Sequence, residues 1–233
     1  MNRKKFINQY KYFNGLDVVI MAGGKGIRLR PFTNHFPKAL YVKNDEVLLK
    51  KILDKFYENG FRKSILCLNY KSELIKAYLN NYEKRFKFTF SIEKKPLGTA
   101  GGLSLIKNKV SKNFFLTNCD LLIDFDYTSA MEFHKKNKCD MTILTAYKNF
   151  KIPYGSIETD TKGNLRSIIE KPNRQYLLNT GFYILNKQIL KYLKKNVHLD
   201  MDQFIKILKK KRKVIKILPI PETSWDDFVE KYN

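Results

Sequence analysis

The residues with the clearest chemical potential form a glycine-rich segment close to the start of the chain. It covers residues 22–33 (AGGKGIRLRPFT), and Pro37-Lys38 follows shortly after it. Glycines let backbone N–H groups approach a phosphate chain closely. Arg28 and Lys38 can neutralise phosphate charge. The segment therefore predicts a site for a phosphorylated ligand.

Two better-known phosphate loops do not fit this segment. A Walker A loop needs GxxxxGK[ST], and no Lys-Ser or Lys-Thr follows these glycines. A dinucleotide-binding fingerprint needs GxGxxG, and counting from Gly24 places Leu29 where the third glycine belongs. A different kind of phosphate site is indicated.

The segment resembles the first loop of the sugar-phosphate nucleotidyltransferases, GGxGxRLxPxT…PK. Further segments resemble other parts of that family, in the same order along the chain. Residues 96–102 (PLGTAGG) resemble its base-contacting loop, and residues 118–120 (NCD) resemble its metal-binding turn. Its sugar-site segments are matched by residues 154–155 (YG), 170–172 (EKP) and 179–181 (NTG), and its C-terminal metal motif is matched by residues 225–227 (WDD). The matches cover residues 17 to 227. Their wording is most similar to bacterial sugar-1-phosphate guanylyltransferase domains.

The resemblance implies a transferase that joins a nucleoside triphosphate to a sugar 1-phosphate and releases pyrophosphate, with Mg²⁺ as cofactor. A phosphate monoester is largely ionised at neutral pH because its second pKa is about 6, so it needs no general base to attack phosphorus. Positioning and charge neutralisation are then the main requirements. An amino or deoxy hexose for surface glycan assembly is the kind of sugar that the family suggests.

The resemblance also assigns roles to individual residues. Those expected to act in catalysis are Arg28, Lys38 and Asp120. The nucleotide would be bound by Ala22, Gly23, Gly24, Gly26, Glu93, Gly98 and Thr99. The sugar phosphate would be held by Gly155, Glu170, Lys171 and Asn179. Magnesium prefers carboxylate and phosphate oxygens, and its expected ligands are Asp120 and Asp227.

Glu93 bears on the choice of base. It stands five residues before Gly98, where the family's base-reading side chain lies. An ionised carboxylate is an acceptor only, and guanine offers it two adjacent donors. Uracil and thymine offer one donor, and members that use them tend to carry Gln. Glu93 therefore favours GTP, although a solvated glutamate beside Lys94 and Lys95 is the alternative.

Two departures from the family pattern leave other functions open. Ile27 replaces the usual Thr of the first loop, and only six residues follow Asp227. A catalytically silent paralogue that binds nucleotide is one alternative. A transferase of the same fold that uses UTP, dTTP or CTP is another, and a nucleic-acid-binding protein is suggested by the net charge of +23.

The charge has a simpler interpretation. The lysines are spread along the whole chain, often on expected helix faces such as that of Lys50, Lys51 and Lys55. Solvated helix faces of this kind need no partner, so we expect small-molecule substrates and no nucleic acid. The three cysteines form no CxxC pair, and no apolar run approaches the roughly 20 residues that span a bilayer. A cytoplasmic protein without a membrane partner is expected, and a homo-oligomer is compatible with the sequence.

The elements that must position these residues follow from hydrophobic periodicity. Strands are expected at 17–21, 64–68, 87–92, 114–117 and 141–146, and helices between them at 47–57, 72–79 and 127–136. This alternation predicts an α/β fold with a mainly parallel sheet covered on both faces. A hairpin (154–158 with 165–169), strands at 180–185 and 214–218 and a helix at 200–210 follow.

The resemblance refines this fold to a Rossmann-like, three-layer, mixed sheet with a small β extension over the sugar site. Residues 17–233 are expected to form a single nucleotidyltransferase domain. Residues 1–16 precede the first strand and are interpreted as an N-terminal arm or linker remnant.

Overall fold

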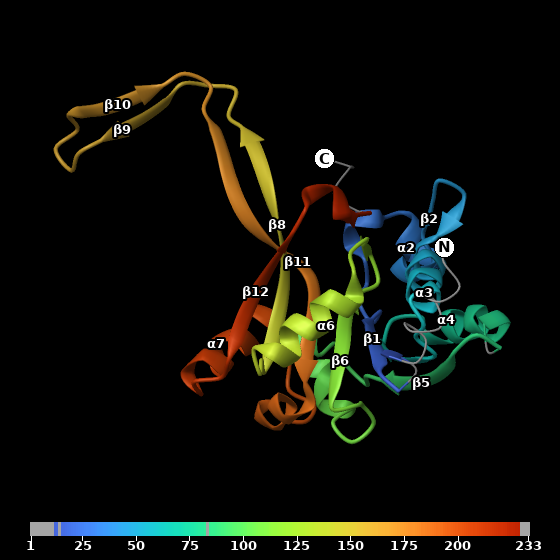
Figure 1. Ribbon diagram of the computed structural model, residues 1–233. Helices are drawn as coiled ribbons and strands as arrows, with labels where there is room; N and C mark the ends of the chain where they lie inside the picture. Colours follow the sequence, from blue (N-terminus) through green and yellow to red (C-terminus); the bar gives the residue numbers. More distant parts are fainter. Residues whose placement is uncertain (1–11, 14, 83, 229–233) are drawn as a thin grey trace.

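A seven-stranded mixed sheet forms the centre of the protein (Figure 1). The structure is a computed structural model, and it describes residues 12–13, 15–82 and 84–228. In spatial order the strands are β12 (Ile215–Ile220), β8 (Met141–Lys151), β11 (Asn173–Asn186), β6 (Asn113–Asn118), β1 (Asp17–Met21), β4 (Lys63–Leu68) and β5 (Lys87–Ile92). Strand β11 runs antiparallel to both of its neighbours, and the other adjacent strands are parallel. The mainly parallel, mixed sheet predicted from the sequence is confirmed.

The order of the strands creates a switch point beside β1. The chain passes from β1 outward to β4 and β5, and then returns to place β6 on the other side of β1. In open α/β sheets, ligands bind where the chain reverses direction in this way, outside the carboxyl ends of the strands. The loops after Met21 and after Asn118 both leave from that place.

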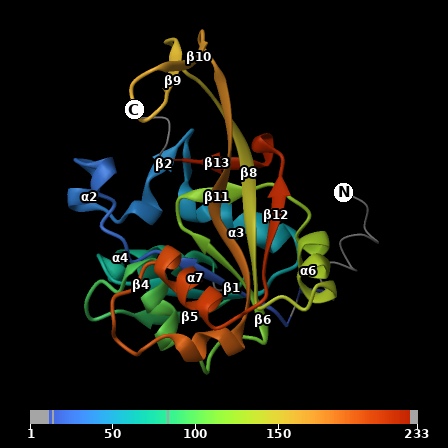
Figure 2. The ribbon, with the colours of Figure 1, turned by 90° about the vertical axis from the view of Figure 1, so that its left-hand side faces the viewer.

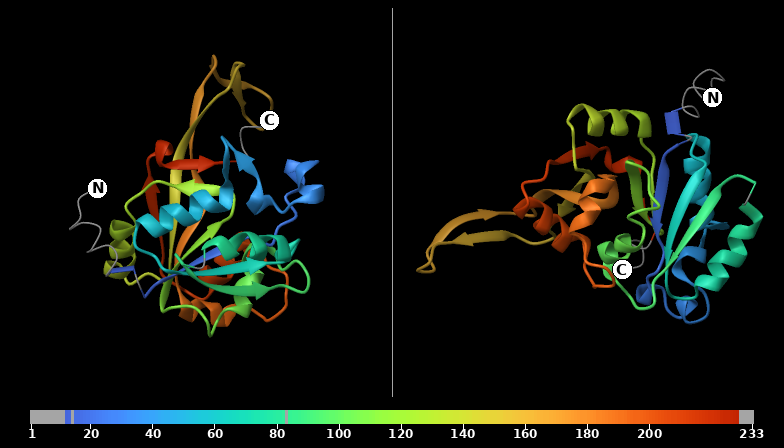
Figure 3. Two further views of the ribbon diagram at one scale, coloured as in Figure 1. Left: turned by 90° about the vertical axis from the view of Figure 1, so that its right-hand side faces the viewer. Right: turned by 90° about the horizontal axis from the view of Figure 1, so that it is seen from below.

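Two cores lie on opposite faces of the sheet and give three layers (Figures 2 and 3). Alternation along β1 sends Val18 and Ile20 into one core and Val19 into the other. The first core contains residues of α3 (Leu48–Glu58), α4 (Ser72–Leu79) and α6 (Tyr127–Lys136), and the second contains residues of α5 (Gly98–Gly101) and α7 (Met201–Lys210).

The smaller elements are short. They are the helix α2 (Phe32–His35), the two-stranded pairs β2 (Val42–Lys43) with β3 (Glu46–Val47) and β7 (Leu121–Ile123) with β13 (Trp225–Asp227), and the 3₁₀ turns η1 (Ile27–Leu29), η2 (Lys38–Leu40), η3 (Asn80–Tyr82), η4 (Gly102–Leu105), η5 (Lys187–Tyr192) and η6 (Glu222–Ser224). No helix within the described ranges is long and apolar enough to cross a membrane.

A cluster of stacked and edge-on aromatic rings fills the first core. Phe56 from α3 lies with its ring centroid 5.1 Å from that of Phe61 and 5.2 Å from that of Tyr127. Phe13 is fully buried in the same core and stacks on Phe61 at 4.5 Å. Aromatic pairs in these arrangements contribute beyond the apolar area that they bury. A core side chain thus comes before residue 17, and the proposed boundary at residues 16 and 17 stays a prediction.

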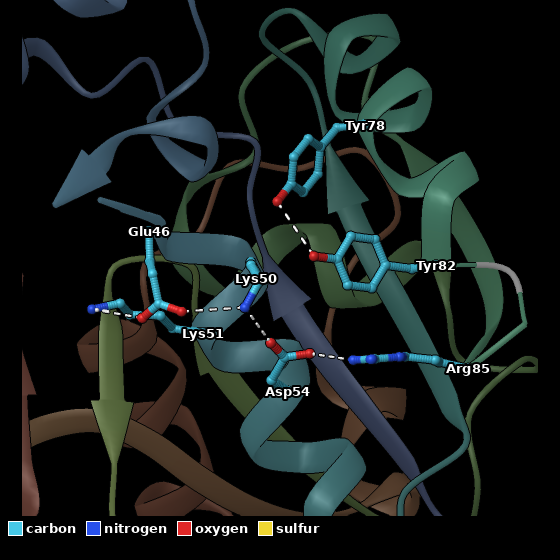
Figure 4. A network of polar contacts seen from close by, with 7 residues as sticks. All are labelled: Glu46, Lys50, Lys51, Asp54, Tyr78, Tyr82 and Arg85. Atoms are coloured by element: carbon cyan, nitrogen blue, oxygen red, sulfur yellow. Dashed lines mark hydrogen bonds and ion pairs between the residues drawn. The ribbon is translucent and has the colours of Figure 1, made fainter. Parts of the chain in front are cut away.

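Lysines on the exposed face of α3 form ion pairs with acidic side chains of the same chain (Figure 4). The ammonium group of Lys50 lies 3.2 Å from a carboxylate oxygen of Glu46 and 2.7 Å from one of Asp54. Hydrogen bonds from Lys50 and Lys51 lower the pKa of Glu46. Arg85 donates to the second oxygen of Asp54 at 2.8 Å, and Lys55 pairs with Asp124. These cations have partners within the chain, as solvated helix faces do.

The structure extends two of the expected strands into a projecting ribbon. Strands β8 and β11 continue past the sheet and lead into a hairpin of β9 (Ser156–Thr159) and β10 (Leu165–Ile169), drawn in yellow and orange in Figure 1. The expected strands at 141–146 and 180–185 are therefore longer than predicted. Pairing of β8 with β11 continues to Lys151 and Asn173. We call residues 147–178 the arm.

Removing the ring of Phe56 tests the aromatic core. Because this side chain is 1% exposed, Phe56→Ala leaves a cavity, and we expect it to lower the free energy of unfolding by about 3–5 kcal/mol. Phe36→Ala is the control, since Phe36 is 49% exposed, and a loss below about 1 kcal/mol is expected there. Urea denaturation measures both, and equal losses would contradict the described packing.

Candidate functional site

A cavity of about 290 Å³ lies at the carboxyl ends of β1 and β6. Five of the residues singled out in the sequence line it: Arg28, Thr99, Asp120, Asn179 and Asp227. They come from five segments that are distant along the chain. The structure thus brings together residues expected to act on the triphosphate, the metal and the sugar.

The first loop takes its shape from Gly26. This residue has φ +62°, and a Cβ placed there would lie 2.8 Å from Cβ of Lys38 and 3.0 Å from Cγ2 of Thr33. Thr33 donates its hydroxyl to the carbonyl of Gly26 at 2.9 Å, and Leu29 donates its N–H to the same carbonyl at 2.9 Å. A glycine is needed for both the left-handed backbone and the close approach.

The rest of the first loop is open. A Cβ on Gly24 would meet nothing within 4 Å, and Gly23 lies beside Asn69. Ala22 is buried, and its N–H donates to Cys67 at 2.9 Å. Ile27, which replaces the family's usual Thr, is 64% exposed and lies outside the core. Its side chain therefore takes no part in the packing that shapes the turn.

Lys38 and Asp120 form an ion pair that joins the first loop to the turn after β6. Both side chains are mostly buried, with relative exposures of 15% and 14%. Charges removed from water in this way need a partner of opposite sign. The pair places an ammonium group and a carboxylate at the cavity, where Asp120 is part of the lining.

A short strand pair brings Asp227 beside Asp120. Strand β13 runs antiparallel to β7, and Asp227 pairs with Leu121, the residue after Asp120. Phe228 donates its N–H to the carbonyl of Asp120 at 3.0 Å. Both carboxylates line the same cavity. The placement of Asp227 thus depends on the pairing of β13 with β7 and on the hydrogen bond that Phe228 donates.

These two carboxylates suit a magnesium ion. No group of three His, Cys, Asp or Glu residues that could hold a metal occurs in the described part of the chain. Magnesium is typically bound through one or two carboxylates together with substrate phosphates, rather than by a complete protein cage. Two hard oxygen ligands on one wall of an open cavity have that character.

The second loop is held by a segment far along the chain. Gly98 has φ +76°, and a Cβ there would lie 2.6 Å from the carbonyl oxygen of Leu199 and 2.7 Å from a carboxylate oxygen of Asp200. Thr99 donates its N–H to Asp200 at 3.0 Å, and its hydroxyl accepts from the N–H of Met201 at 2.8 Å. Thr99 faces the cavity, whereas Gly98 serves the contact with residues 199–200.

Glu93 is buried rather than solvated. It is 6% exposed, and its carboxylate accepts from the N–H of Leu97 at 3.1 Å and contacts Gly102. Burial raises the pKa of this carboxyl, and the Leu97 N–H opposes that shift. The side chain is not among those lining the cavity of Asp120. It lies directly beneath the second loop. Gly102 is a neighbour of both Glu93 and Met21, the last residue of β1.

The expected sugar residues are divided between two places. Asn179 lines the cavity, donates from Nδ2 to the hydroxyl of Tyr183 at 2.8 Å and accepts from the N–H of Gly181 at 3.0 Å. A bulge between Asn179 and Phe182 sets its direction. Gly155, Glu170 and Lys171 instead lie exposed on the arm, where a Cβ on Gly155 would be 3.0 Å from Glu170 Oε2.

Comparison with known proteins gives the same picture over most of the chain. The family model described as "Nucleotidyl transferase" matches residues 17–228. The chain belongs to the nucleotidyl transferase family. The resemblance and the Rossmann-like α/β fold predicted from the sequence are both confirmed.

Relatives of known name support this membership. The mannose-1-phosphate guanyltransferase of Yarrowia lipolytica is 33% identical over 183 residues, which are 74% of this chain and 50% of that protein. The mannose-1-phosphate guanylyltransferase catalytic subunit beta of Drosophila melanogaster is 33% identical over 76% of this chain and 50% of its own length. The chain spans about half the length of these relatives.

A solved structure matches at nearly full length. HddC from Yersinia pseudotuberculosis has a TM-score of 0.72 and 27% identity, with 92% of this chain and 94% of that chain covered. A crystal structure of HddC complexed with GMP-PN matches with a TM-score of 0.71 and 26% identity, over 93% of this chain and 95% of that chain.

Some cavity residues of this nucleotidyl transferase were not assigned a role from the sequence. Asn118, Gly181 and Trp225 stand within the quoted motifs but were given no function, and all three line the cavity. Tyr183 and Asp202 also line it. Tyr183 is separated from the motif at residues 179–181 by Phe182 alone, and this closeness could have indicated it. Asp202 lies in the first turn of α7 and belongs to none of the motifs found in the sequence.

Replacing Gly98 tests the contact that shapes the second loop. Gly98→Ala adds both backbone strain and a clash with Leu199 and Asp200, so we expect the free energy of unfolding to fall by about 3 kcal/mol. Gly163→Ala is the matched control, because Gly163 has φ +85° but a Cβ there meets nothing within 4 Å. A loss of no more than about 1–2 kcal/mol is expected for it. A larger loss for Gly163→Ala in thermal unfolding would refute the clash.

Proposed function

We propose that this protein transfers a guanosine monophosphate group from GTP to a sugar 1-phosphate, with Mg²⁺ as cofactor, and releases pyrophosphate. The observation that carries the proposal is the convergence of Arg28, Asp120, Asp227 and Asn179 on one cavity at the switch point of the sheet. The names of the relatives, which are mannose-1-phosphate guanyltransferases, support the same reaction.

The reaction asks for charge neutralisation rather than proton transfer. An oxygen of the sugar phosphate attacks the α-phosphorus of GTP, a new P–O bond forms, and the bond to pyrophosphate breaks with its electrons staying on the leaving oxygen. Arg28 would neutralise the triphosphate, and Lys38, which already neutralises Asp120, lies at the same wall. Backbone N–H groups of residues 22–26 would support the phosphates.

Asp120 and Asp227 would hold the magnesium ion, which neutralises phosphate charge when it is bound. The ammonium group of Lys38 pairs with the same carboxylate, so Asp120 would link the first loop to the ion. Asn179 would face the sugar, because its amide is held by Tyr183 and by the N–H of Gly181.

The base is assigned through Glu93. Guanine presents two adjacent donors to a carboxylate, and an ionised Glu93 has unused acceptor capacity beyond its bond to Leu97. The HddC complex with GMP-PN contains a guanine nucleotide and supports this choice for the present chain. Production of a nucleotide sugar for surface glycans, in the cytoplasm, belongs to the same proposal.

Asp227 offers a sharp test of the activity. We expect Asp227→Ala to lower kcat/KM by about 100-fold or more, because one metal ligand is lost. Asp226→Ala is the matched control, since Asp226 lies next to it in β13, outside the cavity lining, and its carboxylate is 3.7 Å from Lys43 Nζ. Pyrophosphate release is measured with each nucleoside triphosphate against a panel of sugar 1-phosphates that includes mannose 1-phosphate.

The panel also separates the alternatives. Turnover with GTP, retained in Asp226→Ala and lost in Asp227→Ala, is the expected result. Turnover with UTP, dTTP or CTP in place of GTP would overturn the assignment of the base. Nucleotide binding without turnover on any sugar would instead identify a catalytically silent relative.

The affinity for GTP should depend on pH through Glu93. Burial raises the pKa of this carboxyl, so it takes up a proton at a higher pH than the ordinary value of 4.5. A protonated carboxyl loses an acceptor, whereas guanine donors stabilise the ionised form. GTP affinity is therefore expected to fall as the pH falls through that raised pKa. Calorimetric titration at a series of pH values measures the affinity for GTP. Glu93→Gln is the control, because its affinity still reflects the ionisation of GTP but not that of Glu93. Identical pH profiles for the two proteins would remove Glu93 from the base site.

A further inference from the structure

The arm carries an unusual concentration of exposed apolar side chains. Of the seventeen large hydrophobic side chains exposed on the described chain, nine lie within it: Tyr147, Phe150, Tyr154, Ile157, Leu165, Ile168, Ile169, Tyr176 and Leu177. The most exposed, Tyr154, has a relative exposure of 75%. Exposed apolar groups that are gathered in this way mark interaction surfaces, whereas scattered ones need no explanation.

Exposed apolar side chains of the arm pair with one another across its strands. Ile157 and Ile168 are direct cross-strand partners on one face of the hairpin, with exposures of 59% and 63%. Further along, Phe150 and Tyr176 form an edge-on ring pair, and both remain exposed. All hydrogen bonds and ion pairs recorded for the described residues 149–172 are made within the arm. An isolated two-stranded ribbon of this kind is only marginally stable in water.

The arm is a continuation of the central sheet. Strands β8 and β11 stay in register from Thr145 and Asn179 out to Lys151 and Asn173. At about 3.3 Å per residue, the six steps from Asn179 to Asn173 carry the ribbon about 20 Å away from the cavity. Lys171 and Glu170 lie beyond that point. Figures 1 and 3 show the hairpin extending away from the helices and strands of the body.

The cavity has few basic side chains, whereas the arm carries Lys171. Within the described lining, Arg28 is the only basic side chain, against the three carboxylates of Asp120, Asp202 and Asp227. Lys38 and Lys206, which lie close by, are already paired with Asp120 and Asp202. A site for two phosphorylated substrates needs a further cation, and the one expected to hold the sugar phosphate, Lys171, is exposed on the arm.

We propose that the arm of a second copy of this chain lies over the cavity, so that Lys171 and Glu170 of one copy complete the sugar site of the other. The exchange is reciprocal in a two-fold dimer, because each copy offers the same arm and the same cavity. It covers the apolar side chains of both arms and adds a basic group to each acidic cavity. This inference rests on the proposed function for the role of Lys171, and on exposure and geometry for the contact itself.

A second copy explains more than other occupants do. Closure of the arm onto its own cavity would require the β8–β11 ladder, which is continuous out to Lys151 and Asn173, to bend back sharply. An unrelated protein would cover the apolar side chains but would leave Asn179 and Lys171 in separate places. A second copy covers the arm and brings these two residues to one site.

Complementation between two inactive variants tests the exchange. Asp120→Ala damages the cavity and Lys171→Ala damages the arm, so each variant alone is expected to lose at least about 100-fold in activity. In co-expressed mixtures, half of the dimers are mixed and each contains one intact site, which should restore about a quarter of wild-type activity. Lys162→Ala, at the arm's turn, is the control and should keep full activity.

Several outcomes would overturn the exchange. If wild type is active but the mixture gains nothing over either variant, the arm acts within its own chain. Full activity of Lys171→Ala would remove that residue from the site. Both results leave the proposed function intact, whereas an inactive wild type with every substrate pair counts against the proposed function alone.

The contact itself is tested without any substrate. Light scattering is expected to show a dimer for the wild type and at least a tenfold weaker dimer for the double variant Ile157→Ser/Ile168→Ser. The control, Leu74→Ser/Val214→Ser, removes two exposed apolar side chains outside the arm and should leave the dimer unchanged. A monomeric wild type, or a dimer that is indifferent to the two arm substitutions, would refute the exchange.

Discussion

The ion pair between Lys38 and Asp120 is the contact on which the cavity depends. Each charge is largely removed from water, so neither is stable there without the other. Lys38 also packs against Gly26, whose left-handed backbone closes the first loop, and the carbonyl of Asp120 accepts from Phe228 near the end of the described chain. One interaction therefore fixes the relative positions of the first loop, the turn after β6 and strand β13.

The second loop depends on Gly98 for a different reason. Gly98 is required less by a ligand than by the chain segment at residues 199–200, which approaches to within contact of its Cα. That approach positions Thr99 on the cavity and brings α7, with Asp202, to the same wall. The acidity of the cavity is thus a consequence of how α7 docks, and a phosphate-binding loop and a carboxylate-bearing helix share one backbone contact.

The sequence predicted what local patterns determine. Helices α4 and α6 and strands β1 and β5 have the expected bounds, because their apolar spacing is set by burial against the sheet. Strands β7 and β13 were missed, since three residues are too few to show a period. The outer halves of β8 and β11 were also missed, because residues 147–151 (YKNFK) face solvent on both sides and show no buried alternation.

For the site, motifs identified Asp120, Asp227 and Asn179, whose common cavity the structure describes. Motif order could not show that Lys171 stands on a projecting ribbon, because that depends on where two strands leave the sheet.

The balance of charge in the cavity explains why these parts must work together. Three carboxylates and one guanidinium line a space that has to receive two phosphorylated molecules. Asp120 and Asp227 repel phosphate unless a cation stands between them, so nucleotide and metal ion are expected to bind as a unit. Once that unit is in place, a sugar phosphate adds further negative charge, whereas Arg28 is the one basic side chain of the described lining and the ammonium group of Lys38 is already paired with Asp120. A second basic group is thus required at the moment of transfer, and its delivery from the arm would tie the chemistry to the assembly of two chains.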